Sequence, residues 1–510
     1  MKTKTAFFGR ISDGIENVRQ TPVVKAINGF MASPWGVGLI ALLTVLAHIT
    51  ATEIVLYTLV LAYCLYVCVL GEDFLTLAPL CVFCYIAPSR ANNPGQNDAS
   101  IFSGSTGIFL LVGVGVLLVF FLVRVALDPK MGFGRLFKCK RVLLIGMLAM
   151  GVAYLLSGMN SEHYDEIWGK NMMFALLQFV AVFILYFLLT ALVDWNRERM
   201  GYLMWIGFLA GCVIAIEVVH LYITHFDDFF LNLGVNDRWN RWQIYLGWGM
   251  HNNIGAMLAL TTPFACCLAC RSKHGYLFVL PSVAIVVALF MTLSRTSILA
   301  GVTIYVASVV VMLFKAWRQK LLLLLSGGVL AVGAIALKIY WNDLISVMTD
   351  IFSNGFFDAS GRGALYKAGL AVFKENPVFG EGFYPADMTT FQSAYWLINS
   401  EMTSFFPPRW HNTIIQLLAS CGVVGVVAYF VHRVQTVWLF LRGLTVEKLF
   451  IGFSVAAFLG MSLLDNHFFN LGPVLFYSII MAFVEKGVPA RVEAEEPEEA
   501  PVAEDTVAEM

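Results

Sequence analysis

The sequence predicts an all-α, polytopic membrane protein: a bundle of about fourteen transmembrane helices with a large, partly helical external loop. Two observations predict this fold class: the chain is strongly apolar, and its apolar residues form long runs. Hydrophobic residues make up 59% of the 510 residues and charged ones only 13%, with a mean hydropathy of +0.76. A water-soluble fold cannot bury so much apolar surface, so the lipid bilayer must solvate most of it. The net charge of −1 disfavours nucleic acid as a partner, because binding phosphate calls for a basic domain.

Apolar segments of about the length that a bilayer requires, roughly twenty residues, recur along the chain. They lie at residues 35–51, 54–70, 74–88, 106–127, 141–158, 172–193, 202–223, 253–270, 275–292, 297–315, 321–340, 412–432, 447–464 and 468–485. The segment 74–88 is the shortest of them. If it entered and left on the same side, every later loop would change side.

Lysine and arginine predict the sidedness, because positive residues stay preferentially on the cytoplasmic side. With the N-terminus inside and every segment spanning, about 23 of the 33 Lys and Arg residues lie inside. Three parts result: a basic cytoplasmic N-terminal segment (1–33), a transmembrane domain (34–485) and a disordered acidic cytoplasmic tail (486–510). The long hydrophilic segments 224–252 and 341–411 then lie outside, so we expect function on the external face.

The 341–411 loop contains a predicted helix at the membrane surface. Ser360 can cap a helix that runs from Gly361 to about Glu375 with an apolar stripe along one face. Asn376-Pro377 should end this helix, because the residue before a proline disfavours the helical conformation. Gly380 and Gly382 then allow a tight turn.

His411 lies where this loop returns to the bilayer, so a helix end would hold it while water still reaches it. A histidine can accept a proton near neutral pH, which makes His411 the candidate catalytic base. The alternative is that it only caps the helix or lies at the membrane interface.

Arginines on the predicted external side break the positive-inside pattern. They are Arg295, Arg362 and Arg409, together with Arg238 and Arg241. Guanidinium groups bind phosphate oxygens through paired hydrogen bonds and keep their charge, so these residues suit a diphosphate at headgroup depth. Interfacial snorkelling or ion pairing is the alternative.

Three short motifs follow one another between residues 240 and 430. They are Ser294-Arg295-Thr296-Ser297, then Gly361-Arg362 followed by Glu375-Asn376-Pro377-Val378-Phe379-Gly380-Glu381-Gly382, and then His411-Asn412 with Gly422-Val423-Val424-Gly425 nine residues further on. In this order, with the external loop between the last two, they resemble the O-antigen ligase and O-antigen polymerase superfamily of bacterial membrane glycosyltransferases.

The resemblance implies an inverting glycosyltransferase of the bacterial inner membrane whose donor is an undecaprenyl-diphosphate-linked glycan. It implies that Arg295 first, then Arg362 and Arg409, hold the diphosphate, and that His411 accepts or orients the proton of an acceptor hydroxyl. The acceptor would be a glycan, a lipid or a protein. The greater length and span count favour a polymerase slightly over a ligase.

The resemblance also implies that no nucleotide sugar, metal or other cofactor is needed. Asp227-Asp228 and the carboxylates Glu375 and Glu381 nevertheless leave metal assistance open.

Further polar residues are weaker candidates for substrate contact: His251, Asn252, Asn412, Glu381, Glu217 and His220. Glu217 and His220 share one helix face, and hydrogen bonding to neighbouring helices is the favoured interpretation of that pair. Asp465 lies in a polar turn, where an aspartate base is conceivable, but polar residues in a tight turn need no further explanation.

Two other function classes compete with an enzyme. A transporter or flippase of lipid-linked glycans would suit the many spans and the intramembrane pair Glu217 and His220. However, transporters gather charge at the bilayer midplane, whereas these polar residues gather at one surface. A non-catalytic scaffold fits the acidic tail but leaves the arginine and histidine motifs unexplained.

Overall fold

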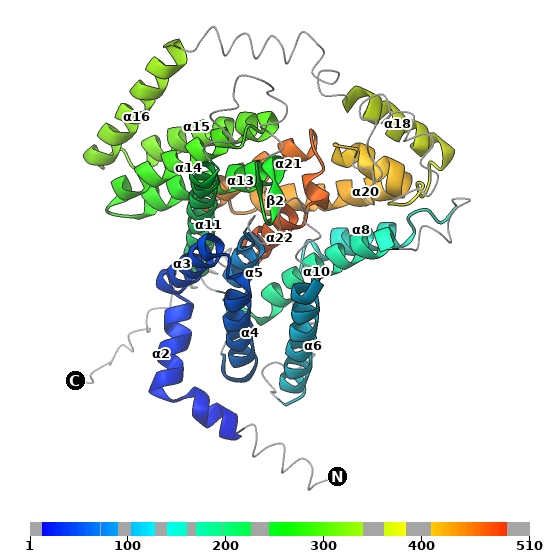
Figure 1. Ribbon diagram of the computed structural model, residues 1–510, viewed down its shortest axis with the longest axis horizontal. Coiled ribbons are helices and arrows are strands. Elements are labelled where there is room, and N and C mark those ends of the chain that lie inside the picture. The colour runs from blue at the N-terminus through cyan, green and yellow to red at the C-terminus, as the bar shows by residue number, and fades with distance from the viewer. Residues whose placement is uncertain are drawn as a thin grey trace, which may run out of the picture.

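The computed structural model describes residues 13–71, 73–89, 104–127, 140–160, 170–195, 197–225, 244–339, 362–383 and 410–486. Over these ranges the chain is a bundle of helices (Figure 1). The two strands of the described chain form one short antiparallel hairpin, β1 (Tyr245–Leu246) with β2 (Gly249–Met250). The predicted all-α bundle is therefore confirmed.

Each apolar segment predicted from the sequence coincides with a helix. In the first half these are α3 (Pro34–Thr50), α4 (Glu53–Leu70), α5 (Leu77–Ile86), α6 (Gly104–Leu127), α8 (Leu144–Leu155), α10 (Lys170–Leu192) and α11 (Arg197–Thr224). In the second half they are α13 (His251–Arg271), α14 (Val279–Met291) after the short η4 (Gly275–Phe278), α15 (Arg295–Lys315), α16 (Lys320–Ile339), α20 (Thr413–Leu441), α21 (Val446–Ser462) and α22 (Leu471–Lys486).

Several of these helices meet the requirements of a membrane span. Among the described residues α4, α10, α11, α13, α15 and α20 are individually long and apolar enough to cross a membrane. A seventh span results if α2 (Pro22–Met31) and α3, which meet at 70°, form one bent unit. Large apolar side chains such as Phe314 (77% exposed) and Leu280 (70%) face outward, as lipid contact requires. The total of fourteen spans stays a prediction.

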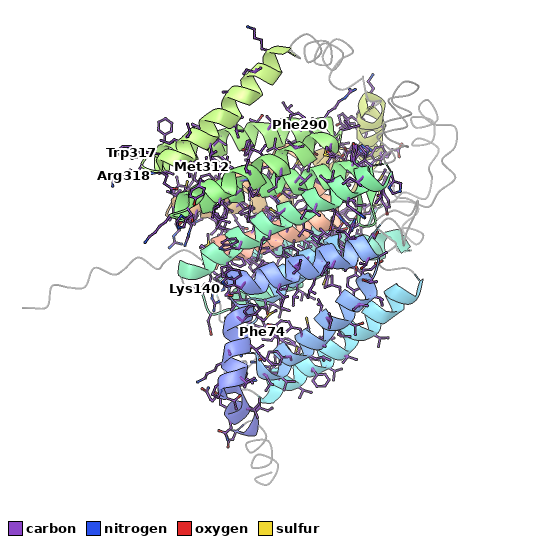
Figure 2. The ribbon with its side chains drawn as sticks, turned by 60° about the vertical axis from the view of Figure 1, so that its left-hand side comes forward. Phe74, Lys140, Phe290, Met312, Trp317 and Arg318 are labelled. Atoms are coloured by element: carbon purple, nitrogen blue, oxygen red, sulfur yellow. The ribbon has the colours of Figure 1, made fainter. Side chains whose placement is uncertain are left out.

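The bundle has two chemically different ends, separated by α13. At the start of α13, Asn252 lies near Ser294 of the α14–α15 connection; at its end, Arg271 pairs with Glu447 at the start of α21. A helix of 21 residues spans about 30 Å, close to the thickness of a hydrocarbon core. We call these the His411 end and the basic end. Figure 2 shows Lys140 and Arg318 of the basic end on one side and Phe290 of the His411 end on the other.

The segment containing α5 runs from one end to the other. Asp73 pairs with Arg199 at the basic end, at 2.7 Å. Ser89 reaches the hairpin at the His411 end, where a Cβ on Gly247 would approach its carbonyl oxygen to 2.6 Å. The shortest predicted segment, 74–88, therefore connects the two ends instead of returning to the side from which it came.

The central helix, α13, is buried along nearly its whole length between α11, α14, α15, α21 and α22. Its sequence is rich in small residues, which let neighbouring backbones approach closely. Gly255 packs against Ser297, and Gly301 packs against Ala259, so α13 and α15 hold a fixed register at the His411 end.

The predicted surface helix is also present, as α18 (Arg362–Glu375), and it ends directly before Asn376-Pro377 as expected. It packs against the first turns of α20, where Gly369 contacts Trp410 and Ile415. Residues 340–361, 384–409 and 487–510 lie outside the described residues.

The segment after α18 docks into a break in α20. Gly422 interrupts that helix with φ of 62°, and the freed backbone bonds to the docked segment: Glu381 N donates to Ala419 O (2.8 Å) and Gly382 N to Ser420 O (3.1 Å). Gly380, with φ of 69°, lies so close that a Cβ there would be 2.4 Å from the Ser420 carbonyl carbon. A Cβ on Gly422 would likewise lie 2.4 Å from the Val378 carbonyl carbon. Both positions therefore require glycine.

Candidate functional site

His411 occupies the turn that begins α20. Its backbone is left-handed (φ of 48°), a conformation uncommon for a residue other than glycine and often found at functional sites. Two contacts fix it: Tyr366 of α18 donates its hydroxyl to His411 O (3.1 Å), and Asn412 caps α20 by accepting from Ile414 N and Ile415 N at 2.8 and 3.1 Å. The helix end thus holds the imidazole in one direction, while 29% of the side chain stays exposed.

The imidazole pairs with Asp465, which lies in the turn between α21 and α22. His411 Nδ1 lies 2.9 Å from Asp465 Oδ1, and the Asp465 side chain is only 7% exposed. Asn466 N also donates to Oδ1, at 2.7 Å, which keeps the carboxylate in place. A carboxylate at Nδ1 favours the tautomer whose proton is on that nitrogen. His411 Nε2, which has no hydrogen-bond partner among the described residues, is then free to accept a proton.

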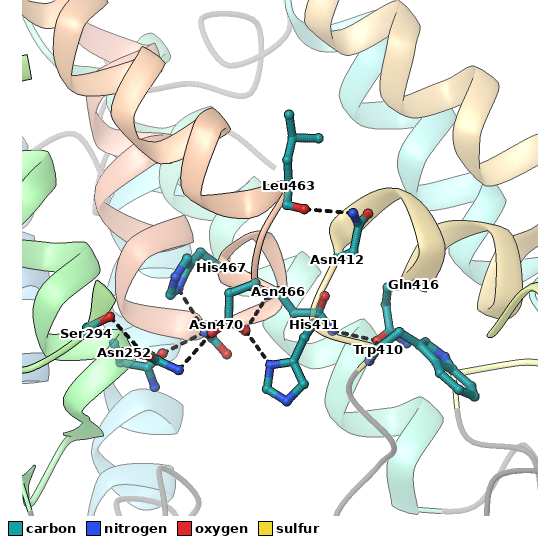
Figure 3. Close-up of polar contacts among 12 residues, drawn as sticks. Asn252, Ser294, Trp410, His411, Asn412, Gln416, Leu463, Asn466, His467 and Asn470 are labelled. Carbon is teal, nitrogen blue, oxygen red and sulfur yellow. Dashed lines mark hydrogen bonds and ion pairs between the residues drawn. The ribbon is translucent and has the colours of Figure 1, made fainter. Parts of the chain in front are cut away.

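Asp465 continues the network toward the other motifs (Figure 3). Asn252 Nδ2 donates to Asp465 Oδ2 at 3.0 Å, and Ser294 Oγ donates to Asn252 Oδ1 at 2.8 Å. Ser294 Oγ also lies 2.9 Å from Ser297 Oγ. The motif at His411 and the motif at Arg295, far apart in sequence, are therefore joined by a continuous chain of hydrogen bonds.

Arg295 is the first residue of α15 and is exposed at the His411 end. Its position is electrostatically unfavourable, because the amino end of a helix carries partial positive charge. The N-cap residue, Ser294, does not cap this helix end with its side chain, because its hydroxyl donates to Asn252. Leu293, just before it, is left-handed with φ of 54°. A guanidinium group next to uncapped backbone amides is an arrangement that attracts an anion.

The turn that carries Asp465 is held on several sides. Asn412 Nδ2 donates to Leu463 O (2.7 Å), and Asn466 Nδ2 donates to Gln416 Oε1 (2.7 Å). Beneath the turn, the guanidinium of buried Arg433 lies 5.0 Å from the centre of the Phe468 ring. Such support from surrounding residues keeps the His411–Asp465 pair in a fixed geometry.

The remaining predicted residues differ in their contacts. Asn252 and Asn412 belong to the network, and His251 is buried (8% exposed) in the first turn of α13. Glu381 contributes its backbone to the docked segment. The side chain of Arg362, at the start of α18, and the whole of Arg409 lie outside the described residues.

Glu217 and His220 form a different cluster, with His48 of α3. Glu217 Oε2 accepts from Trp248 Nε1 at 3.0 Å, and Glu217 Oε1 lies 3.8 Å from His48 Nδ1. The rings of His48 and His220 meet edge to face, with centroids 6.1 Å apart. The described contacts of Glu217 are thus with Trp248 of the hairpin and His48 of α3, and substrate contact by Glu217 and His220 stays a prediction.

The described residues contain no group of three His, Cys, Asp or Glu side chains that could hold a metal ion. The chemistry that these residues offer is proton transfer at His411 and anion binding at Arg295.

Asp465 is the site residue whose role the sequence did not reveal. It lies 54 residues from His411, in a turn with two other polar residues. Polar residues are common in tight turns, so the turn alone accounts for their presence. The one available signal was that a carboxylate stands at the predicted external end of a span.

The fold and this site together define a polytopic helical membrane protein with a histidine–aspartate pair and an arginine-bearing helix terminus at one end of its bundle. Residues 280–430 match the family model described as O-antigen ligase. The match contains Arg295, Arg362 and His411 and confirms the resemblance to the O-antigen ligase and polymerase superfamily over this part of the chain. Comparison with curated proteins found no significant match.

Proposed function

We propose that this chain transfers a glycan from undecaprenyl diphosphate to an acceptor hydroxyl at the external face of the bacterial inner membrane, with inversion at the anomeric carbon. The observation that carries the proposal is the hydrogen-bonded chain from His411 through Asp465, Asn252 and Ser294 to the start of α15. It supports the proposal because it connects His411, the proposed base, to the start of α15, where Arg295 carries a fixed positive charge.

The His411–Asp465 pair supplies the base. The acceptor hydroxyl loses its proton to His411 Nε2 as its oxygen forms the new bond to the anomeric carbon. The bond from that carbon to the diphosphate oxygen breaks, and the leaving group keeps the electron pair. Asp465 stabilises the imidazolium that forms, and the imidazolium later returns its proton to water.

Arg295 supports the leaving group. Negative charge grows on the diphosphate as it departs, and an arginine together with uncapped helix amides stabilises that charge without reorganising. The sequence motifs add Arg362 and Arg409 to this role. Because diphosphate is a good leaving group, the protein chiefly has to align the two substrates and neutralise charge.

The distribution of positive residues supports the orientation. Arg199, Arg271, Lys315, Lys448 and Lys486 all lie at the basic end, which the positive-inside rule assigns to the cytoplasm. The His411 end then faces outward, with both termini in the cytoplasm.

Reconstitution of the full chain in liposomes with an undecaprenyl-diphosphate-linked oligosaccharide tests the proposal. A ladder of products identifies a polymerase, which the chain length favours by family analogy, and single transfer to an added lipid or glycan acceptor identifies a ligase. Movement of the donor across the bilayer with no new glycosidic bond would contradict the enzymatic proposal and identify a flippase.

A further inference from the structure

The hairpin of β1 and β2 links the first half of the chain to the proposed site. Its second strand ends at Met250, which is the N-cap residue of α13, and Asn252 follows in the first turn. The position of the hairpin therefore sets where α13 begins. It also sets whether the Asn252 amide reaches Asp465, which is 3.0 Å away.

Trp248, at the tip of the hairpin, is anchored in the bundle. Its side chain is fully buried, and its Nε1 donates to Glu217 Oε2 of α11 at 3.0 Å. On the other side, Tyr85 donates its hydroxyl to Trp248 O at 3.2 Å, and the two rings lie 5.8 Å apart. Gly247 packs directly on the backbone of Ser89. Hence α11 and the end of the α5 segment contact the tip of the hairpin on two sides and hold it in place.

Stability alone does not explain a glutamate at position 217. Its carboxyl is 1% exposed, and burying such a group is costly unless it is fully hydrogen-bonded. Among the residues that the structure describes, Glu217 Oε1 has no hydrogen-bond partner, and it lies 3.8 Å from His48 Nδ1. An apolar residue would pack against the Trp248 ring at lower cost, but it would not accept the indole N–H.

We infer that Glu217 and Trp248 are positioning residues for transfer: their hydrogen bond fixes the hairpin, and through Asn252 and Asp465 it fixes the direction of His411. This inference rests on the proposed function. It assigns a role to the half of the chain that lies before the matched residues 280–430. A displacement of Asn252 by about 1 Å would break its bond to Asp465, and misplacement of that size can lower rates about a hundredfold.

The test compares Glu217→Ala, Glu217→Gln and Trp248→Phe in the liposome assay. We expect Glu217→Ala and Trp248→Phe to lower kcat about tenfold while the donor KM stays unchanged, because Arg295 is untouched. Glu217→Gln should stay within about twofold of wild type, since its amide oxygen still accepts from the indole. A Glu217→Gln variant as slow as Glu217→Ala would overturn the inference.

The double variant Glu217→Ala/Trp248→Phe sharpens the test, because both substitutions remove the same bond. It should be no slower than either single variant. Losses that multiply would mean that the two residues act separately, and they would contradict the inference.

Ser454→Ala is the matched control, since it removes another buried hydrogen bond to α13, from Ser454 Oγ to Leu260 O in the middle of the bundle. We expect lower thermal stability and unchanged kcat. If Ser454→Ala lowered kcat as much as Glu217→Ala does, a general loss of stability in the packing of α13 would explain both results. The inference would then fail.

Hydrogen exchange separates this inference from the proposed function, because it requires no activity. Backbone amides of the hairpin and of the first turn of α13 should exchange faster in Glu217→Ala and Trp248→Phe than in wild type or Glu217→Gln. Unchanged exchange in these variants would refute the positioning role even if transfer itself were demonstrated.

Discussion

The basic end and the His411 end of the bundle use their positive charges differently. At the basic end, cations bind the carbonyl groups that terminate helices. Lys448 Nζ donates to Leu439 O and Arg442 O at 2.9 and 2.8 Å, and Arg124 donates to Val67 O at 2.5 Å. These contacts supply hydrogen bonds to carbonyls that have no partner within their own helix, and they place positive charge where the helix dipole is negative.

At the His411 end the arrangement is reversed. Arg295 stands at the amino end of its helix, and it forms no ion pair or side-chain hydrogen bond with the described part of the chain. Neutral amides, hydroxyls and one carboxylate carry the network around it, from His411 to Ser294. A cation placed against the helix dipole and left exposed does not stabilise the fold there, which supports the proposed role of Arg295 in binding an anion.

The largest effect is expected from His411→Ala, which removes the proposed base. Transfer should fall by about 10²- to 10⁴-fold, the usual contribution of a positioned base, while the protein stays folded in the membrane. The assay is product formation from the lipid-diphosphate donor, with folding checked by size-exclusion chromatography in detergent. His274→Ala, an exposed histidine of the basic end, is the control and should leave the rate unchanged. Full activity of His411→Ala would remove it from the mechanism.

Asp465→Asn should come next, with a loss of about a hundredfold in kcat. The amide keeps the size of the side chain but removes the charge that stabilises the imidazolium at His411. The same assay compares the transfer rate of Asp465→Asn with that of Asp73→Asn, which alters the carboxylate paired with Arg199 at the basic end. Equal rates for the two variants would show that Asp465 is only a structural residue of its turn.

Arg295→Lys tests the anion site with a smaller change, because the charge is kept and only the planar fork is lost. We expect transfer to fall about ten- to a hundredfold. Arg271→Lys makes the same change at the opposite end, where the arginine pairs with Glu447, and should have no effect on the rate. A fully active Arg295→Lys variant would show that this residue does not clamp the diphosphate.

Lys448→Met tests the basic end of the bundle and should lower the stability of the protein without changing its transfer rate. Lys448 is 2% exposed, and its removal leaves two helix carbonyls without a donor, at a cost of about 1–3 kcal/mol. Thermal unfolding in detergent measures the loss, and Lys273→Met, an exposed lysine nearby, should change little. Reduced transfer per folded molecule in Lys448→Met would mean that the two ends are not independent.

The sequence predicted the helices well, because a long apolar run has few alternatives to a helix in lipid. It also predicted α18 and its end before Pro377, since caps and prolines act over a few residues. His411, Asn412 and Arg295 were found by motif, and the structure connects His411 by hydrogen bonds to Ser294, the residue before Arg295.

Contacts between distant segments were not predictable in the same way. The sequence around Asp465 does not indicate that His411 lies beside it, and the sequence around Glu217 does not indicate its hydrogen bond to Trp248. The break in α20 at Gly422 was likewise hidden, because a glycine in an apolar run is common in membrane helices. Each of these features depends on the backbone approach of two segments that only the folded chain brings together.

The docking of residues 376–382 onto α20 has a consequence for the position of His411. That segment is bonded to the kink of α20, and Trp410 is held at the start of the same helix by its N–H bond to Gln416 (3.2 Å). The two described segments on either side of residues 384–409, namely residues 376–383 and Trp410, are therefore held on one rigid support. We expect a change in the length or composition of the chain between them to leave the backbone of His411 where α18 and α20 hold it.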